Sequence, residues 1–227
     1  MKKSDRIIRK INRNINLFTW FCAFISFFCT LISVINLFDS YKTYRVEPYN
    51  REALDEDAFM CEMFLLREES FKDLSDDKKL HALQTLSDNE TNRAGGNNYP
   101  KVVIRSLPDA YGQYSFKTNE IEIDDCFFHN ATSRELVCVC LHEWHHWYTH
   151  QLSNAYLELP KEYQDMEAFA QYRIYSYEYQ NYVRAEDDIN LYRQQSVEAD
   201  ARSYAKRATD GYFALIEQYY NSIENSC

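Results

Sequence analysis

From Leu17 to Phe38 the chain is almost entirely apolar and contains no charged residue. About 20 residues of this kind, coiled as a helix, are enough to cross the roughly 30 Å hydrocarbon core of a bilayer. A helix of a soluble domain would show a polar face over this length, and none is visible. No small-x-small cleavage pattern follows the segment. It therefore predicts a transmembrane anchor at residues 17–38 rather than a signal peptide.

The two flanks of this segment are unequally charged. Basic side chains are numerous before it: Lys2, Lys3, Arg6, Arg9, Lys10 and Arg13. Soon after it come only Lys42 and Arg45. The positive-inside rule therefore predicts a basic cytoplasmic tail at residues 1–16, with the bulk of the chain outside the cytoplasm. The cysteines beyond the anchor form no disulfide-like framework and are predicted to be free thiols.

Periodic apolar positions continue after the anchor and predict a helical connector region at residues 39–99. Residues 51–70 predict an amphipathic helix whose apolar stripe is formed by Leu54, Ala58, Cys61 and Leu65. A second, shorter helix is predicted from Leu74 to Leu86, with the isolated His81 as a surface or packing residue. Residues 87–100 hold the only Gly-Gly pair of the chain and are predicted to be a polar loop.

The pattern then changes to one typical of a small sheet. Lys101–Leu107 is a β-branched run and predicts a strand. Tyr111–Phe116 and Asn119–Asp124 flank a short Lys-Thr turn, and apolar residues alternate with acids in the second of them, which predicts a β-hairpin. We place the start of the main domain at the beginning of this region and expect it to span residues 100–227.

A helix is predicted from Thr132 to His150. Thr132 and Glu135 have the spacing of a capping box, in which each side chain satisfies a free N–H at the helix start. The first two turns are apolar, with Leu136, Val139 and Cys140, as expected of a buried helix. The segment therefore begins as a helix that lies against a core.

This predicted helix carries the sequence His142-Glu143-Trp144-His145-His146, an H-E-x-x-H motif. Residues four apart share one face of a helix, so His142 and His146 can offer imidazole nitrogens to one ion. Glu143 is rotated by about 100° from His142 and can act on a water molecule without itself being a ligand. Zinc is the metal that this motif predicts, because the same spacing serves zinc peptidases. The alternative is a helix that is merely rich in histidine.

Two histidines are not a complete catalytic zinc site, which normally has three protein ligands. One straight helix does not wrap three ligands around an ion, so His150 is a poor candidate. His145 points away from His146 and is predicted to be exposed or to support the ligands. Two carboxylates remain, Glu167 in a helix predicted at Lys161–Val183 and Glu198 in a helix predicted at Asp187–Ile223. Each has small neighbours that allow close helix packing, so the residues alone leave both open.

Composition restricts the expected partners and the expected fold class. The formal net charge is −10, and the part beyond the basic N-terminus is more acidic than this total suggests. No basic patch with interleaved aromatic residues occurs there, so nucleic acid is not an expected partner. Only four Gly and four Pro accompany 19 Tyr, which indicates long helices with aromatic faces. The predicted fold class is α+β and mostly helical, with a small sheet and long C-terminal helices.

The motif helix together with Glu198 resembles the gluzincin type of zinc metallopeptidase. It is more similar to a group of bacterial and phage zincin-like proteins with a hairpin, H-E-x-x-H and a Tyr-x-x-Gln-x-x-Glu-x-x-Ala helix. The last pattern occurs here as Tyr192, Gln195, Glu198 and Ala201. The resemblance covers roughly residues 111–208. It implies that Glu198 is the third zinc ligand, and that the edge strand of the sheet pairs with an extended peptide substrate.

The chemistry implied is hydrolysis of peptide bonds, with zinc as the cofactor and Glu143 as the general base. An oxyanion donor is also needed, and the candidates are Tyr192, Tyr204, Arg202 and His150. Asp200 is a candidate to orient a ligand imidazole.

Three function classes follow from these features. The first is a membrane-anchored zinc metallopeptidase. The second is a zinc-binding regulatory or interaction protein of the zincin fold, without turnover. The third is a membrane-tethered helical structural protein with an accidental motif.

Overall fold

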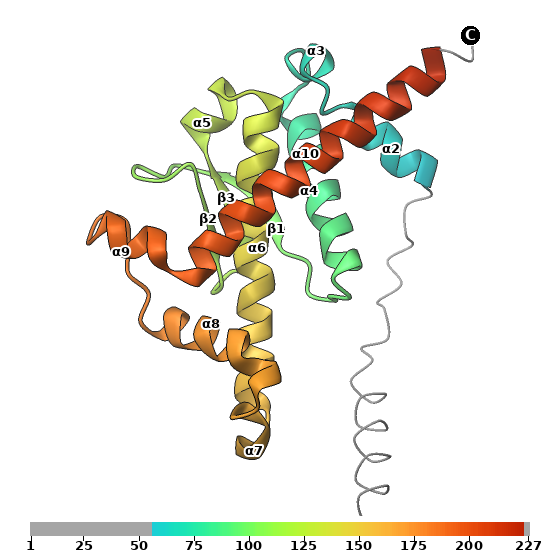
Figure 1. The fold of residues 1–227 in the computed structure, drawn as a ribbon. Helices are drawn as coiled ribbons and strands as arrows, with labels where there is room; N and C mark the ends of the chain where they lie inside the picture. Colours follow the sequence, from blue (N-terminus) through green and yellow to red (C-terminus); the bar gives the residue numbers. More distant parts are fainter. Residues whose placement is uncertain (1–55, 225–227) are drawn as a thin grey trace, which may run out of the picture. The chain divides into compact units, whose positions relative to one another are not determined.

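The computed structural model describes residues 56–224 of the chain (Figure 1). The predicted cytoplasmic tail at residues 1–16 and the predicted anchor at residues 17–38 lie outside the described residues. Among the helices of residues 56–224, none combines the length and apolar character that crossing a membrane requires. The described part is an α+β structure, mostly helical with one three-stranded sheet, which confirms the predicted fold class in outline.

Within the described residues, three helices precede the sheet: α2 (Glu56–Phe64), α3 (Glu68–Phe71) and α4 (Asp76–Arg93). The helix predicted over residues 51–70 is thus interrupted between α2 and α3. Its predicted apolar stripe is also wrong, because Ala58 and Cys61 are exposed whereas Met63 and Leu66 are buried. His81 on α4 is a surface residue, as predicted, and lies near the Glu62 carboxylate.

The prediction of a loop at residues 87–100 is wrong for its first half, because helix α4 continues to Arg93. Its last turns are held by partners from distant parts of the chain. The buried carboxylate of Glu90 accepts hydrogen bonds from Tyr204 and Tyr212. The Trp144 indole N–H donates to Thr91 at 3.0 Å. These tertiary contacts stabilise a helical segment whose polar composition favours a loop.

The sheet consists of β1 (Lys101–Arg105), β2 (Gly112–Ser115) and β3 (Glu120–Asp124), in the order β1-β3-β2. Strands β2 and β3 form the predicted antiparallel hairpin, whereas β1 pairs with β3 in parallel. Asn119 closes the hairpin turn with φ 54°, a left-handed conformation that Asn tolerates better than most residues. Strand β2 is therefore an edge strand.

Helix α6 (Ser133–Glu158) follows the short helix α5 (Asp125–Asn130) and lies beside the sheet, crossed by α10 (Ser196–Glu224) (Figure 1). Its predicted capping box is confirmed, since the Thr132 hydroxyl accepts from the Glu135 N–H and the Glu135 carboxylate accepts from the Thr132 N–H. Leu136, Val137 and Cys140 are buried, so the apolar first turns face the core.

The two long helices predicted after α6 are each interrupted. The first becomes α7 (Lys161–Gln164), the 3-10 helix η1 (Glu167–Phe169) and α8 (Ala170–Gln180). The second becomes α9 (Ile189–Gln194) and α10, with an extended residue, Gln195, between them (φ −57°, ψ 134°). The Gln195 side-chain amide binds both backbone groups of Val183, at 2.9 Å each.

One hydrophobic core joins these elements. It is formed by buried side chains of α2, α3, α4, β1, β3, α5, α6 and α10, among them Met63, Leu86, Val102, Ile121, Leu141, Trp147 and Ile216. The helices between residues 56 and 93 therefore pack into the same core as the sheet and α6. Cys61, Cys126, Cys138 and Cys140 are free thiols, as predicted.

Candidate metal centre

Three side chains from two crossing helices converge at one point. His142 and His146 lie one turn apart on α6, and Glu198 lies in the first turn of α10. The two Nε2 atoms are 3.1 Å apart. Glu198 places Oε1 at 3.2 Å from His146 Nε2 and Oε2 at 3.6 Å from His142 Nε2. Among the described residues, these three form a group that can bind a metal ion.

Two of these separations are close to those between neighbouring ligands of a tetrahedral ion. Zinc binds imidazole nitrogen and carboxylate oxygen at about 2.0–2.1 Å, which separates neighbouring ligand atoms by roughly 3.3 Å. The two Nε2 atoms, 3.1 Å apart, and the pair of His146 Nε2 and Glu198 Oε1, 3.2 Å apart, are close to that value, whereas the 3.6 Å distance to His142 Nε2 is measured from the other carboxylate oxygen. Glu198 Oε2 is buried and lacks a hydrogen-bond partner among the described residues. A bound cation would satisfy this oxygen.

The Glu198 carboxylate is held in its charged form. Burial alone would raise its pKa, but the neighbouring imidazoles of His142 and His146 outweigh burial and hold the pKa well below its usual range. The Tyr182 hydroxyl also donates to Glu198 Oε1 at 2.5 Å, and Arg202 Nη1 lies 3.5 Å from Oε2. A deprotonated carboxylate is the form that binds a metal.

The start of α10 determines where Glu198 lies. The Glu178 carboxylate on α8 accepts from the backbone N–H groups of Ser196 and Val197, at 2.8 and 2.9 Å. These are free donors at the start of a helix, and an anion stabilises them. The predicted Tyr-x-x-Gln-x-x-Glu helix is consequently not continuous, because Tyr192 lies on α9 and Gln195 in the break.

Glu143 lies beside this group on α6 and is only 7% exposed. Its burial raises the pKa of its carboxyl group, and the charge of Glu198 raises it further. The imidazoles of His142 and His146 and the backbone amide of Tyr114 oppose this shift. The net result is a Glu143 carboxyl group whose pKa lies above its ordinary value.

Edge strand β2 approaches α6 closely at Gly112. A Cβ atom at this position would lie 2.6 Å from Val139 Cγ1 and 3.1 Å from Glu143 Cγ. Only glycine avoids these contacts. In the antiparallel register, residues 111, 113 and 115 bond to β3, so the backbone groups of Gly112 and Tyr114 face away from the sheet.

Replacing Gly112 with alanine is expected to lower the free energy of unfolding by about 1–3 kcal/mol, because the added methyl group overpacks the strand–helix contact. Urea denaturation of the full chain measures this change. Gly211→Ala on α10 is the matched control, since a Cβ there meets no atom within 4 Å. It is expected to stabilise α10 by about 0.5–1 kcal/mol. Equal effects of both variants would contradict close packing at Gly112.

The other candidates from the sequence lie away from the three-residue group. Glu167 is exposed on η1. His150 stacks on Phe116, with ring centroids 5.5 Å apart. Asp200 accepts hydrogen bonds from Tyr175 and Gln171 instead of orienting an imidazole, because two residues along a helix rotate it by about 200° from Glu198.

The structure also contradicts the prediction for His145. Its side chain was expected to be exposed or to support the ligands, but the residue is only 8% exposed and packs against Tyr204, with ring centroids 4.9 Å apart. Burial, together with the nearby charge of His146, lowers the pKa of His145 to about 4. Its ring is therefore a neutral part of the packing between α6 and α10.

Sequence reasoning missed Tyr182, which lies just after α8 and contacts Glu198. No motif marks it among the 19 tyrosines of the chain. Of the expected oxyanion donors, Tyr204 is engaged by Glu90. Tyr192 packs on Tyr182, with ring centroids 6.4 Å apart, and hydrogen-bonds with Glu198.

No family model, curated protein or solved structure matches this chain. The function is therefore inferred from the geometry and chemistry of the site itself. The features that bear on it are the group of His142, His146 and Glu198, the buried Glu143 and the edge strand β2.

Proposed function

We propose that this chain is a membrane-anchored zinc metallopeptidase of the gluzincin type. The observation that carries the proposal is the convergence of His142, His146 and Glu198 beside the buried Glu143. A metal site alone would serve a binding protein equally well. A carboxylate with raised proton affinity next to it is the additional element that hydrolysis needs. Residues 17–38 supply the proposed anchor, from their sequence alone.

Zinc is the proposed metal because two imidazoles and one carboxylate are a ligand set of catalytic zinc enzymes. When bound, zinc lowers the pKa of a coordinated water to about 7 and polarises the carbonyl of the substrate. His142, His146 and Glu198 would hold the ion. Tyr182 and Arg202, which contact the Glu198 carboxylate, would fix its orientation.

Glu143 is the proposed general base. It would accept a proton from the attacking water and donate it to the nitrogen of the leaving amine. Burial raises the pKa of Glu143, so it binds a proton more readily than an exposed carboxylate, while the neighbouring imidazoles limit this shift. A base with these properties can both take and return the proton.

The proposed substrate is an extended peptide paired with β2. The backbone groups of Gly112 and the C=O of Tyr114 face away from β3 and could pair with such a peptide, whereas the Tyr114 N–H already hydrogen-bonds with Glu143. The close approach of β2 to α6 would bring a paired peptide near Glu143. Aromatic side chains border this strand, since Tyr114 and Phe116 both lie against His150.

Tyr182 is the proposed donor to the oxyanion, and its single hydroxyl hydrogen would turn from Glu198 Oε1 to the oxyanion as this forms. Its hydroxyl is at the metal centre, while the residue as a whole is 40% exposed and accessible to a substrate. Burial of the ring and the charge of Glu198 raise the pKa of Tyr182 above its ordinary value, so the hydroxyl stays protonated. A protonated hydroxyl can donate to the negative oxygen that develops during hydrolysis.

Replacing Tyr182 with phenylalanine is expected to lower kcat by about 100-fold, because one oxyanion donor is lost. Steady-state kinetics and zinc affinity are measured together. Tyr177→Phe on α8, whose side chain is exposed, is the control and should leave both quantities unchanged. Weaker zinc binding at unchanged kcat would assign Tyr182 only to the support of Glu198.

The proposed function is tested on the full chain in detergent. Zinc is quantified after purification without chelator, and the protein is then incubated with a peptide library whose products are identified by mass spectrometry. The proposal expects about one zinc per chain and cleavage that a chelator abolishes. Zinc without cleavage would favour the regulatory or interaction protein. Absence of both would leave a tethered helical scaffold.

A further inference from the structure

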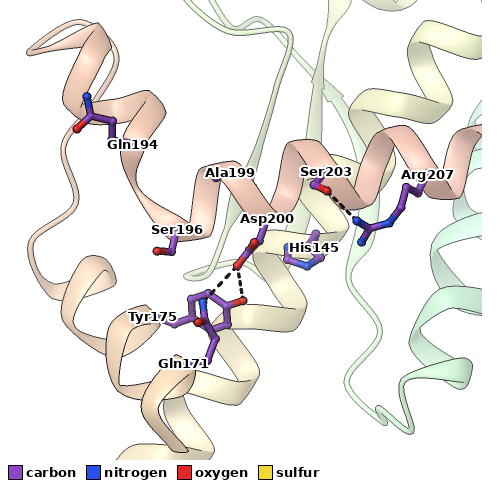
Figure 2. Close-up of a pocket in the computed structure, with 9 residues that line it drawn as sticks. All are labelled: His145, Gln171, Tyr175, Gln194, Ser196, Ala199, Asp200, Ser203 and Arg207. Atoms are coloured by element: carbon purple, nitrogen blue, oxygen red, sulfur yellow. Dashed lines mark hydrogen bonds between the residues drawn. The ribbon is translucent and has the colours of Figure 1, made fainter.

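A polar cavity lies on the other side of α10 from the metal centre. It has a volume of about 500 Å³ and is bordered by α6, α8, α9 and α10 (Figure 2). Ser196, Asp200, Ser203 and Arg207 of α10 line it, at spacings that put them on one face of the helix. None of the proposed metal ligands lines this cavity.

Two opposite charges face this cavity without pairing. Asp200 uses Oδ2 to accept from the Tyr175 hydroxyl at 2.7 Å and from Gln171 at 3.3 Å. Arg207 donates to the Ser203 hydroxyl at 2.8 Å. Within residues 56–224, neither Asp200 nor Arg207 forms a salt bridge. The cavity thus presents a carboxylate and a guanidinium group that both have capacity for a further ionic partner.

His145 lies between these charges, as Figure 2 shows. It is 8% exposed, and its Nδ1 atom is buried without a hydrogen-bond partner among the described residues. Asp200 and Arg207 line the same cavity as this ring.

The charges are spaced for a small ligand. Asp200 and Arg207 are seven residues apart, which is about 10.5 Å along a helix. Arg207, however, reaches back to Ser203, only three residues or about 4.5 Å from Asp200. A ligand with ammonium and carboxylate groups a few ångströms apart therefore fits between them, with Gln171 and Ser203 as neutral neighbours.

We propose that this cavity is a binding site for a small zwitterion of the amino-acid class, either a free amino acid or a dipeptide. The ammonium group pairs with Asp200, and the carboxylate pairs with Arg207 and Ser203. The site is distinct from the metal centre but shares both of its helices. Asp200 is two residues from Glu198, and His145 directly precedes His146.

The experiment is isothermal titration calorimetry of the full chain in detergent with L-glutamine and with glycyl-L-glutamine. The only charges of these probes are the terminal ammonium and carboxylate groups. The protein is treated with chelator beforehand, because amino acids also bind zinc and the proposed metal centre must not contribute. This treatment makes the result independent of the proposed peptidase function.

At least one probe is expected to bind, and both Asp200→Asn and Arg207→Gln are expected to weaken its binding by about tenfold. Lys206→Gln is the matched control, because Lys206 lies beside Arg207 on α10 but pairs with Asp210. N-acetyl-L-glutamine and L-glutamine α-amide, which each lack one charge, should also bind about tenfold more weakly.

Three results would overturn the zwitterion site. The first is no binding of either probe to the wild-type chain. The second is unchanged binding in either cavity variant. The third is equal binding of either singly charged derivative, a result that does not depend on how the variants fold.

Discussion

Replacing Glu143 with glutamine is expected to lower the rate of peptide hydrolysis by about 10²- to 10⁴-fold, while the chain still binds zinc. Glutamine keeps the size of the side chain but cannot accept a proton. Glu143 lies beside the metal-binding group without belonging to it, so its replacement leaves the three candidate ligands in place. The measurements are kcat/KM for a peptide found in the library and zinc content by mass spectrometry.

The control for this prediction is Glu158→Gln. It makes the same change on the same helix, at the exposed last residue of α6. This variant should keep wild-type activity. Full hydrolysis by the Glu143 variant would show that another group takes the proton. Loss of zinc together with activity would assign Glu143 to the structure of the metal centre.

Replacing Glu198 with glutamine is expected to weaken zinc binding by at least about 100-fold, because changes that merely support a ligand already cost 10- to 100-fold. The change removes the charge of a fully buried carboxylate that faces two imidazoles. The amide retains the volume and can still accept from Tyr182. Competition with a zinc-sensitive dye measures the affinity, and circular dichroism checks the fold.

Glu167→Gln is the matched control, since Glu167 was the other candidate ligand and is exposed on η1. This variant should bind zinc as the wild type does. A zinc-induced rise in Tm should occur in the wild type and the control but not in the Glu198 variant. Wild-type affinity in the Glu198 variant would contradict its assignment as a ligand.

Local sequence predicted the elements whose determinants lie close together along the chain. The capping box of Thr132 and Glu135 predicted where α6 begins, because both partners lie within one turn. The four-residue spacing of His142 and His146 predicted that both imidazoles share one face, since it depends only on the helical repeat. The hairpin of β2 and β3 followed from alternation and a short turn.

The predictions from sequence were wrong where contacts with residues far along the chain override the local preference for a loop or an exposed side chain. The segment at residues 87–93 is polar, yet it is helical because Glu90 and Thr91 bind side chains of α10 and α6. His145 is buried because Tyr204 of α10 covers it. Such partners are more than 50 residues away along the chain, so no local pattern contains them.

For the candidate site, too, some features follow from local sequence and others from tertiary packing. By itself, the sequence determined a helix that presents two imidazoles and a neighbouring carboxylate, because the helical repeat is a local property. Only the tertiary structure brought Glu198 rather than Glu167 beside the two imidazoles, placed Tyr182 against Glu198 and packed β2 closely against α6. Those choices depend on how α10 crosses α6, and this crossing results from packing of the whole core.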